Sequence, residues 1–413
     1  MGKIKSFIIG AAAVCCPFLA GTSTAAGTAL RSAAYISAGA AELPWGGIFP
    51  AESDRTSKPD SSSTSGTSSH RSTDSRGSTG IRPSGSSTPS KSTVSTSTVT
   101  SGAESSPPDT ASTSVTDVPE PQQKLGKIIT VNRTESTDDT DYSEFTEKSG
   151  EIYRYNFGKQ QSDDYITLRS GAQVRNCTEL TNAELAEAAK IEPTFGVLDS
   201  EQPSVLIYHT HTSESFLPYG DSFDADYPNR SGDPSRNMTA VGDAICESLS
   251  QRGISSVHDC TVYDSPMFTG AYYRSADGMR EILDKYPSIK IVLDIHRDGI
   301  INEDGSLVAP VAEVDGKDAA QFMIISGCDD GDMDMPDYME NFKLACLLQN
   351  CAEEAYPDLA RAVLFDYRNY NQDVSTGALL IEVGSHGNSL DEAVYTGELL
   401  GNIIADALEK GAE

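Results

Sequence analysis

Three short apolar runs in the second half of the chain each end in side chains that bind metals or transfer protons. They are Val205–Glu214 (VLIYHTHTSE), Ile291–Asp298 (IVLDIHRD) and Leu379–Val383 (LLIEV). Apolar runs of this length, bounded by polar residues, predict buried strands. Because open α/β sheets bind ligands beyond the carboxyl ends of their strands, we expect the three polar ends to meet at one edge of a sheet.

The remainder of the pattern from about residue 124 to residue 413 supports an α/β fold with a mostly parallel sheet flanked by helices. Short apolar runs alternate there with amphipathic ones. A hairpin inserted in the sheet is expected at Asp315-Gly316. Strands are expected at Val205–Tyr208, Ile254–His258, Ile289–Ile295, Gln321–Ser326 and Ala378–Val383. Helices are expected at Thr181–Lys190, Met238–Arg252, Tyr338–Tyr356 and after Ser389, which has the capping-box spacing to Glu392.

Composition divides the chain into four parts. Residues 1–50 are expected to direct export. Residues 51–123 are expected to form a disordered linker, because Ser, Thr, Pro and Gly dominate this second segment. A flexible chain of that length spans about 45–50 Å, at roughly 5–6 Å times the square root of residue number. Residues 124–202 are expected to form an N-terminal extension that packs on a catalytic domain, and residues 203–413 to form that domain.

The N-terminus has the charge pattern of an export signal. Lys3 and Lys5 precede Ser6–Leu30, which carries no charge. This pattern predicts a signal peptide, cut after small residues such as Ala38-Gly39-Ala40, or an uncleaved signal anchor. A spanning helix needs about 20 apolar residues, and the stretch reaches that length only when its Ala, Gly and Thr are counted. Of the two, we favour the uncleaved anchor. In both cases the lysines stay inside and the remainder is exported.

Net charge and cysteine spacing exclude two classes of function. The formal net charge of −30 argues against binding to DNA, RNA or another polyanion. Of the eight cysteines, the six that follow Cys16 contain no C-x-x-C pair, which argues against a thiolate zinc site or a redox motif. Burial is the expected role of most of these thiols.

The polar ends of the three runs supply the side chains of a mononuclear zinc hydrolase. A catalytic zinc takes three protein ligands, keeps one position for water, and works with a carboxylate that moves protons. His211, Glu214 and His296 are the candidate ligands, since His-x-x-Glu spacing places an imidazole and a carboxylate on one tight turn. Glu382, at the end of a buried strand, is the candidate general base.

Several neighbouring residues leave alternatives open. His209 can replace His211 as ligand, because residues two apart on a strand point to the same side. We prefer His211 for its spacing to Glu214 and expect His209 to support the ligands from behind or to contact the substrate. Asp294, Arg297 and Asp298 surround His296, where a carboxylate can orient a ligand histidine. The alternative to a role in the site is that Arg297 and Asp298 form an ion pair on the protein surface. Glu382 can instead be a structural hydrogen-bond partner, and His386 is expected to be exposed to solvent.

The same residues carry a resemblance to a known family. YHTHTSESF (Tyr208–Phe216), DIHRD (Asp294–Asp298) and IEVGSHGN (Ile381–Asn388), in that order, resemble the stage II sporulation protein P family of membrane-anchored peptidoglycan hydrolases. The family's catalytic domain is akin to zinc N-acetylmuramoyl-L-alanine amidases. The match spans about residues 203–413. The short spacing from His211 to Glu214 departs from the wider amidase pattern.

The resemblance implies an activity, a location and partners. It implies cleavage of the amide between muramic acid and the first stem L-alanine, with endopeptidase action on cross-links as a further activity. Zinc would bind His211, Glu214 and His296, and Glu382 would be catalytic. The enzyme would be anchored in the cell membrane and act between the two membranes at the engulfing septum. Stage II sporulation proteins D and M would be its partners.

Two other classes of function remain as alternatives. A zinc carboxypeptidase would use the same ligands but needs a cation for the substrate carboxylate, for which Arg297 is the candidate. A catalytically inactive wall-binding scaffold would keep the fold without depending on metal or on Glu382.

Overall fold

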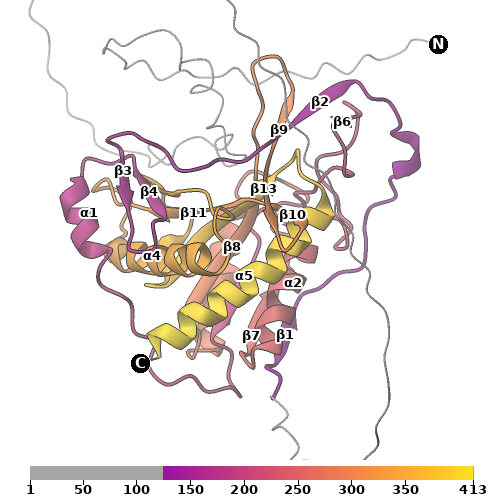
Figure 1. Cartoon of the computed structure of the whole chain (residues 1–413). Coiled ribbons are helices and arrows are strands. Elements are labelled where there is room, and N and C mark those ends of the chain that lie inside the picture. Colours follow the sequence, from indigo (N-terminus) through magenta and orange to yellow (C-terminus); the bar gives the residue numbers. More distant parts are fainter. Residues whose placement is uncertain (1–123, 413) are drawn as a thin grey trace, which may run out of the picture. The chain divides into compact units, whose positions relative to one another are not determined.

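A nine-stranded mixed sheet organises residues 124–412, the part of the chain that the computed structural model describes (Figure 1). Its strand order is β1-β7-β5-β8-β13-β11-β12-β4-β3, and all neighbours are parallel except β13 with β11 and β4 with β3. The strands are β1 (Ile128–Val131), β3 (Tyr165–Thr167), β4 (Gln173–Asn176), β5 (Val205–Tyr208), β7 (Ser256–Asp259), β8 (Ile291–Asp298), β11 (Phe322–Gly327), β12 (Val363–Asp366) and β13 (Ala378–Ser385). The mostly parallel α/β sheet is therefore confirmed. The predicted export segment and linker lie outside the described residues.

The predicted hairpin at Asp315-Gly316 is present, but its predicted place in the main sheet is wrong. Both residues have positive φ, 51° and 75°, as a tight hairpin turn requires. The hairpin strands β9 (Leu307–Val314) and β10 (Lys317–Ala320) join β2 (Gly150–Tyr155) and β6 (Ser222–Phe223) in a second sheet of order β10-β9-β2-β6. The main sheet cannot accept the hairpin beside β11, because β13 and β12 already occupy both edges of that strand.

Helices cover both faces of the main sheet. On one face α2 (Met238–Gln251), α4 (Tyr338–Ala355) and α5 (Leu390–Gly411) share a core with alternate residues of β5, β8 and β13 (Figure 1). On the other face α3 (Ala271–Lys285) packs against β5 and β8. Asp294 and His296 alternate with residues of the first core and therefore belong to the α3 face. Within residues 124–412, no helix is long and apolar enough to cross a membrane.

The predicted elements are confirmed, with ends shifted by up to three residues. Ser389 and Glu392 form the predicted capping box at the start of α5. Thr181 and Glu184 form another at the start of α1 (Asn182–Ala188). Residues 124–202 supply strands to both edges of the main sheet, β1 at one and β4 with β3 at the other. The six cysteines of the described region are free, and all except Cys177 are buried.

Candidate functional site

The main sheet brings His211, Glu214, His296 and Glu382 together at one edge. Parallel pairing of β13 with β8 places Glu382 directly beside His296. The loop after β5 places the His211 ring 5.2 Å from the His296 ring, centroid to centroid, and Glu214 Oε2 3.7 Å from His296 Nδ1. All four side chains are buried. Three segments far apart in sequence thus form one cluster.

Asp294 holds the loop after β5 against β8. Its carboxylate accepts from the Thr210 backbone N–H (2.8 Å) and from the Thr210 hydroxyl (2.7 Å). The Glu214 N–H donates to the His211 carbonyl oxygen (3.0 Å), which closes the tight turn expected for His-x-x-Glu. Asp294 Oδ1 also lies 2.8 Å from His296 Nε2, in an ion pair too poorly aligned to be a hydrogen bond. This contact leaves Nδ1 of His296 facing Glu214.

The cluster contains several buried polar atoms without a hydrogen-bond partner. They include both ring nitrogens of His211, Oε1 of Glu214 and Oε2 of Glu382. Leaving one such atom unpaired costs about 1–3 kcal/mol, so proteins rarely tolerate a group of them without a bound species to complete them. Imidazole nitrogens and carboxylate oxygens are the donor set that zinc prefers. Within residues 124–412, however, no three metal-type side chains already form a complete binding group.

Aromatic residues fix the orientation of His211. Phe268 stacks flat on its ring at 4.2 Å, and Tyr272 of α3 packs edge-on at 5.5 Å. Tyr272 also lies parallel to the His296 ring at 6.3 Å, and its buried hydroxyl has no partner. Neither aromatic residue was predicted from the sequence, because neither Phe268 nor α3 belongs to an apolar run that ends in polar side chains.

Burial and local charge separate the protonation states of the four residues. Burial, assisted by the charge of His296, lowers the pKa of His211 to about 2, so the ring is neutral and one of its nitrogens keeps a lone pair. Burial also lowers the pKa of His296, but Asp294 and Glu214 outweigh it and raise that pKa to about 9. Burial and the charge of Asp298 raise the pKa of Glu382 to about 8. Such separated values in one cluster are typical of functional sites.

His209 lies on the opposite side of the sheet from His211. Its Nδ1–H donates to the Ile295 carbonyl oxygen (2.9 Å), and its Nε2 is 3.0 Å from Nε2 of His258. Nδ1 of His258 contacts Asp243 (3.1 Å), which forms a two-point ion pair with Arg133. The chain leaves β5 after Tyr208, so the alternation that would place both histidines on one side does not extend to His211.

The predicted surface ion pair between Arg297 and Asp298 is wrong. Both side chains are buried, because residues 215–230 cover this end of the sheet. Arg297 donates to the carbonyl oxygens of Ser215 (2.6 Å) and Asn229 (2.7 Å), so it fastens that segment. Asp298 instead pairs with Arg361 at 3.0 Å. Arg361 precedes β12, in a segment where the sequence carries no signal of a site.

Two further expectations about the site change. His386 is half-buried rather than exposed. Its backbone N–H donates to the Asp298 carbonyl oxygen (3.0 Å), and Nδ1 of its ring has no hydrogen-bond partner. Arg230, which the sequence analysis did not single out, lies 3.6 Å from Oε1 of Glu214 and 2.8 Å from Asp264. Ser213 donates to Asp264 (2.6 Å), so its hydroxyl belongs to this ion-pair cluster.

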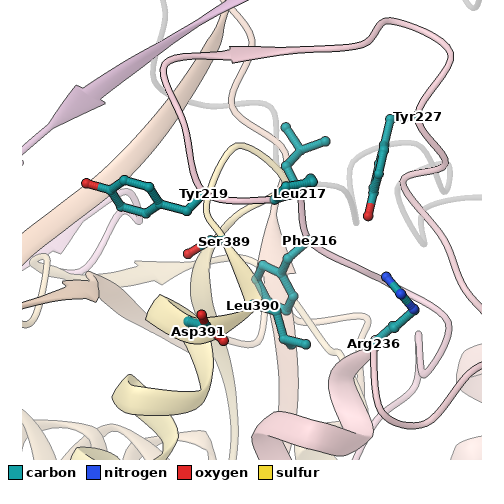
Figure 2. A pocket seen from close by; sticks show the side chains of 9 residues that line it. Phe216, Leu217, Tyr219, Tyr227, Arg236, Ser389, Leu390 and Asp391 are labelled. Atoms are coloured by element: carbon teal, nitrogen blue, oxygen red, sulfur yellow. The ribbon is translucent and has the colours of Figure 1, made fainter. Parts of the chain in front are cut away.

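A hollow of about 180 Å³ adjoins the segment that carries Glu214 (Figure 2). Phe216, Tyr219 and Tyr227 line it together with Arg236 and the first turn of α5. None of the four clustered residues lines it, although Phe216 lies only two residues, about 7 Å of chain, beyond Glu214. The hollow is therefore a neighbour of the cluster and not its cavity.

Comparisons with known proteins agree on one family. The sequence model of the family described as stage II sporulation protein P (SpoIIP) matches residues 104–405. Stage II sporulation protein P of Bacillus subtilis (strain 168) is 30% identical over 255 residues, which cover 56% of this chain and 60% of that protein.

Solved amidase structures also show a partial likeness. N-acetylmuramoyl-L-alanine amidase AmiC2 of Nostoc punctiforme has 15% identity and a TM-score of 0.28, covering 51% of this chain and 94% of its own. The CwlD amidase of Clostridioides difficile, in complex with the GerS lipoprotein, has 12% identity and a TM-score of 0.30, covering 50% and 95%. TM-scores of this size do not establish a shared fold.

Proposed function

The chain belongs to the stage II sporulation protein P family, and on that premise we propose that it is a zinc-dependent peptidoglycan hydrolase of sporulation. Its reaction would be hydrolysis of the amide between muramic acid and the first stem L-alanine. Endopeptidase action on peptide cross-links would be a further activity. The observation that carries the proposal is the group of buried, unpartnered imidazole and carboxylate atoms at the polar edge of the sheet.

His211, Glu214 and His296 are the residues that would hold zinc. Both nitrogens of His211 and one oxygen of Glu214 lack partners, and His296 turns Nδ1 toward Glu214, so the donors present fit the ion. Asp294 would steady His296 from behind, as carboxylates commonly do for ligand histidines. When bound, zinc polarises a carbonyl oxygen and lowers the pKa of a water molecule.

Glu382 is the proposed general base. Its position beside His296 supports this role, in which its carboxylate would accept a proton from the attacking water and deliver it to the leaving amine. Burial supports this role, because a desolvated carboxylate has a raised pKa and is therefore a stronger base than an exposed one. Arg297 holds the 215–230 segment over the cluster and would keep water out.

The setting of the reaction is part of the proposal. Residues 1–50 would anchor the chain in the cell membrane, and residues 51–123 would let the catalytic part reach the wall from the extracytoplasmic side. Peptidoglycan would be the substrate, in the space between the two membranes at the engulfing septum. Stage II sporulation proteins D and M are the protein partners proposed from the family.

A carboxypeptidase that uses Arg297 to bind the substrate carboxylate is disfavoured. Arg297 is buried, and its guanidinium already donates to two backbone carbonyl oxygens. The inactive scaffold is disfavoured by the unpartnered atoms, since a protein without chemistry gains nothing from them.

Digestion of cross-linked peptidoglycan by the full-length chain tests the proposal. Intact stem peptides with a free L-alanine amine, identified by mass spectrometry, should appear with zinc and disappear with a chelator. Separated stems still attached to sugar would mean endopeptidase action, and shortened stems would mean a carboxypeptidase. A Glu382→Gln variant should lose about 10²–10⁴-fold in rate while keeping its zinc. Release of the same products at the parent rate by this variant would refute the assignment of Glu382.

A further inference from the structure

Arg361 lies near the carboxyl end of β8, beside Asp298, and most of the N–H groups of its guanidinium have no hydrogen-bond partner. The residue sits just before β12, where its N–H donates to the Phe322 carbonyl oxygen (2.8 Å) and its own carbonyl oxygen accepts from Gln349 (2.9 Å). Its backbone is therefore held on both sides. The residue is only 6% exposed, so its side chain has little access to water.

One end of the guanidinium is paired and one edge is not. Nη1 donates to Asp298 (3.0 Å), whereas Nε and Nη2 are buried without a partner. The N–H bonds of Nε and Nη2 share one edge and run parallel, which is the geometry that binds both oxygens of a carboxylate. The ring of Phe157 lies 5.7 Å from the guanidinium carbon and cannot satisfy these donors. An unsatisfied charged edge in such a place is costly unless a ligand uses it.

The free edge lies within reach of a substrate held at the cluster. Asp298 is two residues, about 7 Å, beyond His296 along β8. Arg361 is a further 3.0 Å from that carboxylate. The Phe322 carbonyl oxygen that accepts from the Arg361 backbone N–H belongs to the β11 residue paired with Val383, directly after Glu382. An extended peptide advances about 3.3 Å per residue, so the second residue past the cleaved bond can bring a side-chain or main-chain carboxylate to Arg361.

We propose that Arg361 binds a free carboxylate on the second residue of the stem peptide and makes that carboxylate a requirement for fast cleavage. The proposal rests on the proposed function, since it names the part of the peptidoglycan substrate that the site recognises. Arg361 would be a specificity-determining residue with no part in the proton transfers. The stem peptide would then run from the cluster toward β12.

The test compares two synthetic substrates on the full-length chain. Both are N-acetylmuramoyl peptides that begin L-Ala-D-Glu, and they differ only in whether the α-carboxyl of the glutamate is free or amidated. The zinc-loaded parent should prefer the free carboxylate by about 10- to 100-fold in kcat/KM, the range expected for a charged two-point contact. An Arg361→Lys variant keeps a positive charge beside Asp298 but lacks the two-donor edge, so its preference should fall to about threefold or less. Arg252→Lys, at the C-terminal end of α2, is the matched control and should keep the parent's preference.

Two outcomes would overturn the inference. If Arg361→Lys slows both substrates equally and keeps the parent's preference, Arg361 only positions Asp298 and does not read the substrate. If the parent cleaves the two substrates with equal kcat/KM, Arg361 does not bind the carboxylate of the second stem residue.

Failure of the proposed reaction is separable from failure of this inference. If the parent cleaves neither substrate, both peptides are titrated calorimetrically into the Glu382→Gln chain and into a Glu382→Gln, Arg361→Lys double variant. Tighter binding of the free carboxylate that the double variant loses supports the inference. Equal affinities of the two peptides for Glu382→Gln refute it.

Discussion

Two histidines that stand two residues apart in His209-Thr210-His211, directly after Tyr208, have opposite surroundings. On the α2 face, each ring nitrogen of His209 has a partner, and the contacts continue through His258 and Asp243 to Arg133. On the α3 face, neither ring nitrogen of His211 has one, although the ring is equally buried. The comparison separates a histidine that stabilises the fold from one that is available to a ligand.

The partnered side also has a defined proton position. Because the Ile295 carbonyl can only accept, His209 carries its proton on Nδ1 and accepts at Nε2. Nε2 of His258 faces that accepting nitrogen, and Nδ1 of His258 faces the Asp243 carboxylate. Burial, assisted by the neighbouring His258, lowers the pKa of His209 to about 3, which agrees with a neutral ring. Gly242 allows the approach, because a Cβ there would lie 2.4 Å from His258 Nε2.

The largest effect that would sharpen the comparison is expected from His211→Ala. Loss of a ligand should remove zinc and lower activity by at least about 10³-fold, because the ion supplies several kcal/mol of transition-state stabilisation. The free energy of unfolding without zinc should fall less than in His209→Ala, since the loss of two unsatisfied buried atoms offsets the cavity left beside Phe268 and Tyr272. Metal content by mass spectrometry and denaturant unfolding in chelator check both parts. Parent-like zinc binding would exclude His211 as a ligand.

The reverse substitution, His209→Ala, should act mainly on stability. It leaves the Ile295 carbonyl oxygen and Nε2 of His258 without a partner in a buried place and opens a cavity, which together should cost about 2–4 kcal/mol. Zinc content should remain at one ion per chain. Denaturant unfolding measures the cost, and a His258→Ala background should reduce it by at least about 1 kcal/mol, because the two rings act as a pair. Loss of zinc in stably folded His209→Ala would break the comparison.

The smallest effect concerns acid stability and Asp243. Burial alone would raise its pKa, but contacts with His258 and Arg133 lower it from 3.8 to about 2. A folded-state pKa below the unfolded one means that ionised Asp243 stabilises the fold above about pH 4, and this contribution is lost as the pH falls toward 2. Asp243→Asn should therefore be less stable than the parent at pH 7, and the difference should shrink between pH 4 and pH 2. A constant difference across that range would assign the effect to packing.

Much of the fold could be predicted because its strands are apolar and bounded by polar turns. The runs at Val205–Tyr208 and Ala378–Val383 match β5 and β13 closely. The strand β12 and the helix α3 were not predicted, because β12 is only four residues long and the apolar face of α3 is set among many charged residues. The hairpin was predicted in the wrong sheet. Partners of a strand depend on which edges are free, and that depends on residues far away in the chain.

The candidate site divides in the same way. By itself the sequence determined that His211, Glu214, His296 and Glu382 each follow or end an apolar strand, because periodicity and spacing are local properties. Only the tertiary structure decided that His209 faces α2 and contacts His258, and that Arg297 donates to backbone carbonyl oxygens. It also decided that Arg361 pairs with Asp298 beside the cluster. Those outcomes depend on which distant donors and acceptors are left unpaired after the sheet assembles, and no local pattern contains that information.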